Sequence, residues 1–167
     1  MLNCFLNHHS RYQVTIWAGV IAGTFATLIQ VLLWLAFTDD FPSILFRDAR
    51  LTAALILGGS VLPPPATFDV GVMLVATLIH FILSIAYTAV LAALAARLAA
   101  VTALLAGIGF GIALYLLNLY GFTLIFPWFA QARGWIALLA HGVFGITAIS
   151  AYRYLNVNNA RSQADEH

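Results

Sequence analysis

The sequence predicts an all-helical integral membrane protein: a bundle of four membrane-spanning helices in two tandem helical hairpins, with a short interfacial helix in the first outer loop. Four stretches of the 167 residues are long and apolar enough to cross a bilayer, and 63% of the residues are hydrophobic. Only 8% are charged, whereas soluble domains carry about 25%. This composition excludes an ordinary water-soluble fold. A net charge of +1, with no basic run, also excludes nucleic-acid binding.

The expected spans occupy residues 14–37, 70–96, 99–121 and 135–153, within one membrane domain that covers residues 1–167. A hydrocarbon core about 30 Å thick requires about 20 residues of helix, and each stretch meets that length. The backbone in lipid must satisfy its own hydrogen bonds, which favours helices. The first apolar stretch is longer than the core of a secretory signal and no cleavage site follows it, so we expect a retained helix.

The outer loop after the first span carries an amphipathic segment at residues 43–57, SILFRDARLTAALIL. Its charged residues, Arg47, Asp48 and Arg50, alternate with apolar ones at helical spacing, as in a helix that lies in the headgroup plane. Gly58 can end this helix because glycine tolerates positive φ angles. Thr67 or Asp69 can cap the second span. The segment is therefore predicted to be a structured surface lid.

Charge on the connections sets the expected orientation. Four spans place both termini on one side, together with Arg11, Arg97, Arg153 and Arg161. The opposite loops hold three arginines beside four aspartates. The positive-inside rule then predicts a multi-pass protein of the bacterial inner membrane with both termini in the cytoplasm. The four tryptophans lie near the proposed boundaries, as expected of an aromatic belt.

Small residues mark the faces through which these helices are expected to pack, because membrane helices approach closely where side chains are small. The candidate packing residues are Gly19, Gly23, Ala103, Gly107, Gly111 and Gly145. The first span has a second small-residue face, at Ala18, Ala22 and Ala26, so one of its faces is free in principle to meet another subunit.

Repeated motifs indicate that the two hairpins arose by duplication. The segment that closes the first span, Ala36-Phe37-Thr38-x-x-Phe41-Pro42, resembles Gly121-Phe122-Thr123-x-x-Phe126-Pro127 after the third. Leu78-x-His80-x-x-x-Ser84 in the second span resembles Leu139-x-His141-x-x-x-Gly145 in the fourth. Two copies in parallel topology would be related by a pseudo-twofold axis along the membrane normal.

The intramembrane histidines are the main chemical signal. His80 shares a helical face with Thr77, Ser84 and either Tyr87 or Thr88, and ionisable groups in a bilayer usually face the bundle interior. If duplication places His80 and His141 across the pseudo-axis, the pair suits haem b or a quinone headgroup. The alternative is two neutral histidines that stabilise the bundle. Gln30, Tyr115 and Asn118 are interpreted as hydrogen-bonding groups that set helix register.

Catalytic signals are missing. No Asp or Glu falls within a span, no nucleophile–base pair is visible, and the lone Cys4 excludes a disulfide framework or a cysteine-built metal site. We therefore expect no catalytic residues and no metal site.

The stretch RDARLTAALILGGSVLPPPATFD, from Arg47 to Asp69, together with the later histidine-containing helices, resembles a family of small proteobacterial four-helix inner-membrane proteins. Some members carry a sodium/proline symporter name. The resemblance covers most of the chain and implies the four-helix membrane fold, without a catalytic motif.

These observations favour a non-catalytic inner-membrane subunit that packs beside a larger membrane partner or forms a homo-oligomer in the bilayer. One alternative is a redox subunit that binds haem b or quinone through His80 and His141. A further alternative is a small carrier that acts as an oligomer with the outer loop as its gate, and a membrane enzyme is the least favoured reading.

Overall fold

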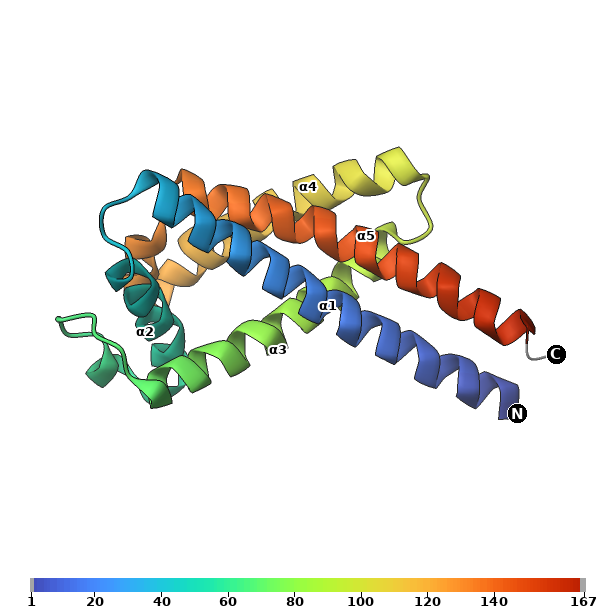
Figure 1. Ribbon diagram of the computed structural model, residues 1–167, viewed down its shortest axis with the longest axis horizontal. Helices are drawn as coiled ribbons and strands as arrows, with labels where there is room; N and C mark the ends of the chain where they lie inside the picture. Colours follow the sequence, from blue (N-terminus) through green and yellow to red (C-terminus); the bar gives the residue numbers. More distant parts are fainter. Residues whose placement is uncertain (1, 166–167) are drawn as a thin grey trace.

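The computed structural model describes the backbone of residues 2–165 and the side chains of residues 11–162 and 164 (Figure 1). The side chain of Cys4 lies outside this part of the chain. Every regular element of the described part is helical, as the sequence predicts. The α-helices are α1 (Leu2–Phe37), α2 (Ser43–Leu57), α3 (Val70–Ala95), α4 (Ala100–Leu116) and α5 (Trp135–Asp165). Short turns of other helix types are η1 (Gly59–Val61), η2 (Leu117–Gly121), η3 (Phe122–Leu124) and η4 (Pro127–Ala132).

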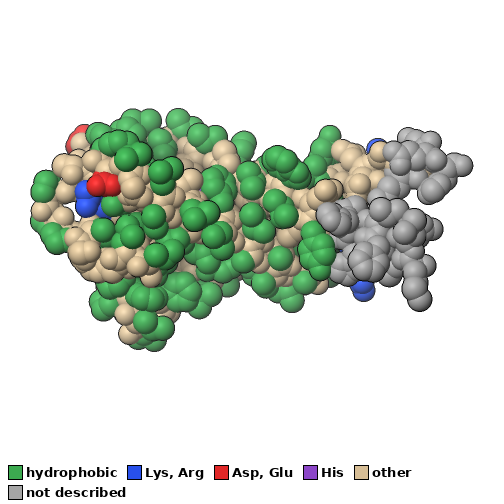
Figure 2. Space-filling model, turned by 90° about the horizontal axis from the view of Figure 1, so that it is seen from below, with side chains coloured by type: hydrophobic (Ala, Val, Ile, Leu, Met, Phe, Trp, Pro, Cys, Tyr) green, Lys and Arg blue, Asp and Glu red, His purple; other side chains and the backbone are tan. Residues whose placement is uncertain are grey.

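Four segments are long and apolar enough to cross a membrane, which confirms the predicted class of helical membrane bundle. They are Arg11–Phe37, Val70–Ala95, Ala100–Leu124 and Trp135–Ser162. Helix α1 begins before residue 14 and α5 continues past residue 153, so both are longer than their expected spans. Figure 2 shows hydrophobic side chains over most of the visible surface, with charged side chains toward its two ends.

Helix α5 is central to the packing. It runs along both α1 and α4, while α1 also packs against α3 and α2 lies against α3. The core between these helices includes Ala22, Leu91, Ala103, Phe144 and Ile149. Helices α3 and α4 touch each other little. The bundle is therefore closed on the α1–α5 side and loose between α3 and α4.

Backbone contact replaces side-chain packing between α4 and α5. A Cβ atom on Gly145 would collide with the Gly107 carbonyl, and one on Gly111 would collide with the His141 carbonyl. Ala103 is fully buried in the same part of the bundle. In lipid, such close approach provides the van der Waals contact that drives helix association.

The two small-residue faces of α1 both meet other helices of the same chain. A Cβ atom on Gly19 would lie 2.7 Å from the Ile85 Cα atom, and one on Gly23 would lie 2.7 Å from the Ser84 hydroxyl oxygen, both on α3. Ala22 and Ala26 belong to the core that includes Phe144 of α5. Both small-residue faces of α1 thus contact other helices of the same chain.

Helix α2 is packed more tightly than a helix that floats in the headgroup plane. Ala53 clusters with Val72 and Ala76 of α3, and the indole of Trp128 donates a hydrogen bond of 3.0 Å to the Leu51 carbonyl. Gly58 ends the helix with φ 75°, and its N–H bonds the Ala54 carbonyl. Of the three charged residues in this amphipathic segment, Asp48 lines a cavity among the helices.

The loop after α2 is anchored at both ends. The Arg50 guanidinium donates to the carbonyls of Val61 (2.9 Å) and Thr67 (3.0 Å). The Asp69 carboxylate accepts a hydrogen bond of 2.9 Å from the Val72 N–H and so caps α3, as one of the two predicted caps. Arg50 therefore holds the proline-rich segment to α2.

The third span is not a single α-helix to residue 121. Its last turn, η2, is π-helical, with one more residue per hydrogen-bonded turn than an α-helix. Arg133 stabilises this turn: its Nε donates to the Leu119 carbonyl at 2.8 Å, its Nη2 donates to Thr123 at 2.9 Å, and its guanidinium lies 4.2 Å from the centre of the Tyr120 ring.

Candidate functional site

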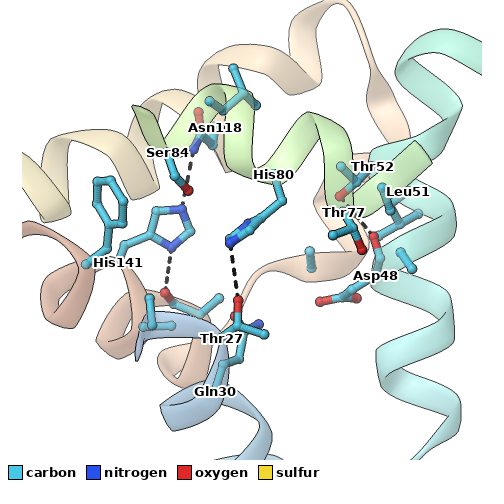
Figure 3. Close-up of a pocket in the computed structure, with 18 of the residues that line it drawn as sticks. Thr27, Gln30, Asp48, Leu51, Thr52, Thr77, His80, Ser84, Asn118 and His141 are labelled. Carbon is cyan, nitrogen blue, oxygen red and sulfur yellow. Dashed lines mark hydrogen bonds between the residues drawn. The ribbon is translucent and has the colours of Figure 1, made fainter. Parts of the chain in front are cut away.

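A chamber of about 460 Å³ lies among the helices of the bundle, beside α2 (Figure 3). Its walls come from all five α-helices and from the turns that follow α4. Most of the lining is apolar or aromatic. The polar or ionisable lining residues are Thr24, Thr27, Gln30, Asp48, Thr52, Thr77, His80, Ser84, Tyr87, Asn118 and His141. Volume and lining are those of a small-molecule site, which is typically apolar with a few placed polar groups.

The two membrane histidines line this one chamber although they come from different hairpins. The predicted polar face of α3 also lines it, through Thr77, His80, Ser84 and Tyr87. Of the two residues proposed for the last position, Tyr87 lines the chamber, whereas Thr88 is buried and does not. The helical spacing of these residues thus identified one wall of the site.

His141 is held by protein partners on both sides of its ring. Nδ1 lies 2.7 Å from the Ala137 carbonyl, which can only accept, so Nδ1 carries the proton. Nε2 then accepts from the Asn118 amide nitrogen, at 3.4 Å. The Asn118 side-chain oxygen in turn accepts from the Tyr87 hydroxyl at 2.8 Å. This directed chain from Tyr87 to Ala137 assigns one tautomer to His141 and orients its ring.

His80 is bound on one side only. Its Nε2 lies 3.3 Å from the Thr27 hydroxyl oxygen, and a ring N–H donates to the Gly23 carbonyl. Both partners belong to α1. Figure 3 shows the ring directed from α3 toward Thr27 of α1, and both histidines line the chamber. His80 is therefore the histidine with a ring nitrogen available to a ligand, and in the neutral ring that nitrogen can only accept a hydrogen bond.

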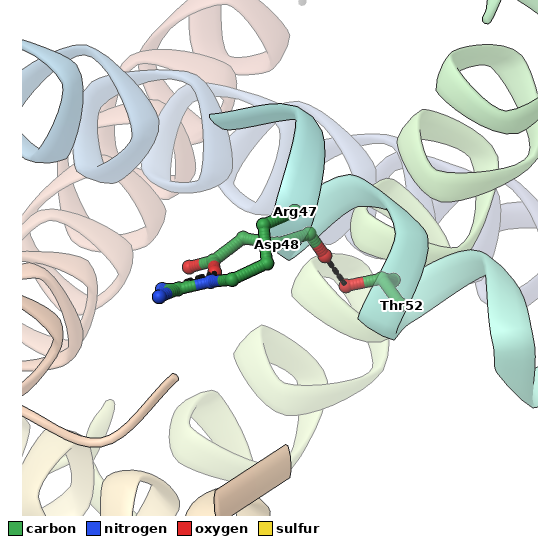
Figure 4. Close-up of polar contacts among 3 residues, drawn as sticks. All are labelled: Arg47, Asp48 and Thr52. Carbon is green, nitrogen blue, oxygen red and sulfur yellow. Dashed lines mark hydrogen bonds and ion pairs between the residues drawn. The ribbon is translucent and has the colours of Figure 1, made fainter. Parts of the chain in front are cut away.

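Asp48 of α2 forms part of the chamber wall. Its Oδ1 accepts from Arg47 Nη2 at 2.7 Å and from Arg47 Nε at 2.9 Å, and Thr52 donates to its backbone carbonyl at 3.0 Å (Figure 4). Burial raises the pKa of Asp48, although the neighbouring Arg47 acts to lower it. Asp48 also lines a smaller outer pocket of about 120 Å³, with Arg133 and Thr38. The carboxylate therefore lies between the chamber and the smaller pocket.

Several lining residues were not predicted as part of a site. Asn118 and Gln30 were interpreted as register-setting groups, and Asp48 as a surface charge. Asp48 and Thr52 lie one helical turn apart on α2, and that spacing was a usable signal for an inward polar face. Trp34 was expected at the membrane boundary, but it is 5% exposed because it forms part of the chamber wall.

Comparison with known proteins identifies one partial likeness. A stretch of 51 residues is 43% identical to an undecaprenyl-diphosphatase of Deinococcus deserti. The match covers 30% of this chain and 18% of that protein, so most of each chain lies outside it. No protein-family model matches the chain, and no solved structure matches it.

Proposed function

We propose that this integral membrane protein binds a neutral amphiphile of the quinone class. The headgroup of the ligand lies in the chamber beside α2. The observation that carries the proposal is that His80 and His141 line a single cavity between apolar helices, together with Ser84 and Asn118. Hydroxyl and amide groups can donate to the oxygens of a quinone ring, an imidazole nitrogen without a proton can accept from the O–H of the reduced quinol, and aromatic walls suit the flat faces of either form.

The charge of the lining favours a neutral ligand. No arginine lines the chamber among the described residues, and its one acid is Asp48. Phosphate and diphosphate groups are usually bound by cations. Arg47 and Arg133 line the outer pocket, where Arg47 pairs with Asp48 and Arg133 bonds Leu119. The partial likeness to an undecaprenyl-diphosphatase therefore does not lead us to propose diphosphate hydrolysis for this chain.

The geometry favours a quinone over haem b. A haem iron held between two histidines needs a free ring nitrogen from each, directed at the metal. His141 Nε2 is engaged by Asn118, and His80 Nε2 lies beside Thr27. Haem binding would require the Asn118 bond to His141 to break, whereas the reduced form of a quinone, a quinol, can donate an O–H to the remaining nitrogen of His80 without that change.

The expected role as a non-catalytic packing subunit stays a prediction. One of its three motivations, with the scarcity of soluble mass and the lack of a reactive cluster, was a surplus of small-residue faces, but both faces of α1 are in contact with α3 and α5. A membrane partner, a homo-oligomer or an oligomeric carrier would have to use other surfaces. Native mass spectrometry of gently solubilised membranes would detect such an assembly and its copy number.

The decisive experiment is ligand retention. Protein purified from native membranes into nanodiscs should release a quinone on solvent extraction, and the emptied protein should bind an added long-tailed benzoquinone. His80→Ala should weaken binding of the reduced ligand, the benzoquinol, by about tenfold, as expected for the loss of one hydrogen bond of about 1.4 kcal/mol. The control Leu78→Ala, which changes an exposed side chain on the same helix, should leave the affinity unchanged.

Two results would contradict the proposal. A wild-type preparation that holds no quinone and binds no added benzoquinone would exclude the ligand class. A Soret absorption band without quinone would show that the histidines bind haem instead.

A further inference from the structure

The chamber reaches the surface between α1 and α3. Most of its lining side chains are buried or half-buried, but Thr24, Thr27 and Leu28 of α1 and Thr77 of α3 are exposed. Leu28 is 53% exposed. A residue that both lines a cavity and is exposed marks the place where that cavity opens. We call this opening the side window and define its rim as Thr24, Leu28, Thr77 and Phe81.

The crossing of two helices produces the side window. Helices α1 and α3 are in closest contact where Gly19 meets Ile85 and Gly23 meets Ser84. From there they diverge toward α2, as Figure 1 shows. Helix α2 spans the wide end of the gap and contributes Asp48 and Thr52 to the chamber. The window is therefore bounded by three helices, with His80 just inside it (Figure 3).

The surface around the side window is apolar. Phe25 of α1 is 53% exposed, and Leu74 and Leu78 of α3 are 66% and 60% exposed. All three lie within segments that can span the membrane. In a bilayer such a surface faces acyl chains. The chamber thus opens to lipid between α1 and α3.

We propose that the ligand enters from the bilayer through the side window and leaves its alkyl or polyprenyl tail there, between α1 and α3, while its headgroup contacts His80. This inference rests on the proposed function. The route requires no break in the close α1–α5 packing, and it moves the headgroup from lipid to the chamber without exposing the tail to water. Leu28 and Phe81 supply the apolar rim against which a tail can lie.

A pair of neighbouring substitutions tests the window. Thr77→Trp adds an indole at the rim, whereas Leu78→Trp adds the same group to the lipid-facing surface one residue away. We expect Thr77→Trp to weaken binding of a long-tailed benzoquinone by at least about tenfold. Binding of a tail-less benzoquinone should stay within about twofold of wild type, because only the tail occupies the window. Leu78→Trp should leave both affinities unchanged.

The outcomes separate the two proposals. Wild-type protein that binds neither benzoquinone contradicts the proposed function itself. If the wild type binds both, equal binding of the long-tailed ligand by Thr77→Trp and Leu78→Trp overturns the window. Loss of both ligands in a Thr77→Trp protein with wild-type thermal stability also overturns it, because a tail-less ligand at equilibrium leaves the window empty. Leu28→Trp, on the opposite rim, makes the same comparison should Thr77→Trp fail to fold.

Discussion

At the scale of single residues, the two histidines differ in how many of their ring nitrogens are hydrogen-bonded within the protein. The Ala137 carbonyl and the Asn118 amide occupy both nitrogens of His141, so this ring is a fixed part of the wall. His80 receives its partners from α1 alone. Interhelical hydrogen bonds in membranes contribute about 0.6 kcal/mol each, enough to orient a ring but little for overall stability. The asymmetry therefore matters for binding more than for folding.

Asp48 should make stability depend on pH in an unusual direction. Because burial raises its pKa above the ordinary value of 3.8, the native state binds this proton more tightly than the unfolded state does. The contribution is fully present below the unfolded pKa and is lost as pH rises through the higher folded pKa. Asp48→Asn should remove this decline. Thermal unfolding of the detergent-solubilised protein across acidic and neutral pH measures it.

Asp39→Asn is the matched control for Asp48, since it removes an exposed acid from the preceding loop. The control should keep the wild-type profile. Identical pH profiles for wild type and Asp48→Asn would show that the Arg47 ion pair compensates fully for burial.

Helical spacing was sufficient to predict the α3 wall of the chamber, because Thr77, His80, Ser84 and Tyr87 share one face whatever the neighbours are. The sequence could not predict the inward orientation of Asp48, because that depends on how α2 rotates when Ala53 packs on α3. It could not predict the role of Asn118 either, since the π-helical turn η2 carries this residue.

At the scale of elements, corresponding contacts recur in the two hairpins. Gly23 meets Ser84 between α1 and α3, and Gly107 meets Gly145 between α4 and α5. Ser84 and Gly145 also correspond in the repeated histidine motifs. Thr27 then corresponds to Gly111, the first beside His80 and the second against the His141 backbone. The duplication stays a prediction, and these contacts support it.

The π-helical turn explains an inconsistency in the repeat. The motifs that close the first and third spans align Thr38 with Thr123. Continued back along the chain, that alignment would place Ala26 opposite Gly111, whereas the contacts place Thr27 there. The contacts are thus displaced by one residue. Between Gly111 and Thr123 lies η2, whose wider turn accommodates one additional residue. A one-residue insertion in the second hairpin would therefore account for both η2 and the position of Asn118.

The α4–α5 interface should be intolerant of a single methyl group. Gly145→Ala places a Cβ atom against the Gly107 backbone, which cannot rotate away, so we expect a loss of about 1–3 kcal/mol in unfolding free energy. Gly109→Ala, on α4 itself, meets nothing within 4 Å and should be neutral or slightly stabilising. Unfolding by SDS titration in mixed micelles compares the two. Equal stabilities would contradict the close backbone contact between Gly107 and Gly145.

At the scale of the whole molecule, the bundle departs from twofold symmetry. In a symmetric pair of hairpins the α1–α5 contact would have an equally close counterpart between α4 and α3, but α3 and α4 touch little. Hydropathy predicted the number of spans because length and composition determine it. The sequence could not predict the asymmetry, because helix crossing points depend on contacts such as Gly19 with Ile85. The chamber exists because the helices diverge beyond that crossing.

The four-span arrangement predicts which parts of the chain share a side of the membrane. Arg153 of α5 donates to the carbonyls of Ala96 and Leu98, at 3.2 and 2.6 Å, which ties the α3–α4 connection to the same end of the bundle as the C-terminal part of α5 (Figure 1). Helix α2 and its loop lie at the opposite end. By the positive-inside rule, the end with Arg97 and Arg153 should be cytoplasmic.

Single cysteines in a Cys4→Ser background test this topology, using Ser60→Cys beside α2, Ala99→Cys in the α3–α4 connection and Ser162→Cys near the end of α5. All three positions are exposed, and none of the changes removes an arginine. In intact spheroplasts a membrane-impermeant maleimide should label only Ser60→Cys, and the other two should react after permeabilisation. The reverse pattern would invert the orientation but keep the four spans. Labelling of Ala99→Cys and Ser162→Cys from opposite sides would contradict the bundle itself, because α5 would then not cross the membrane beside α4.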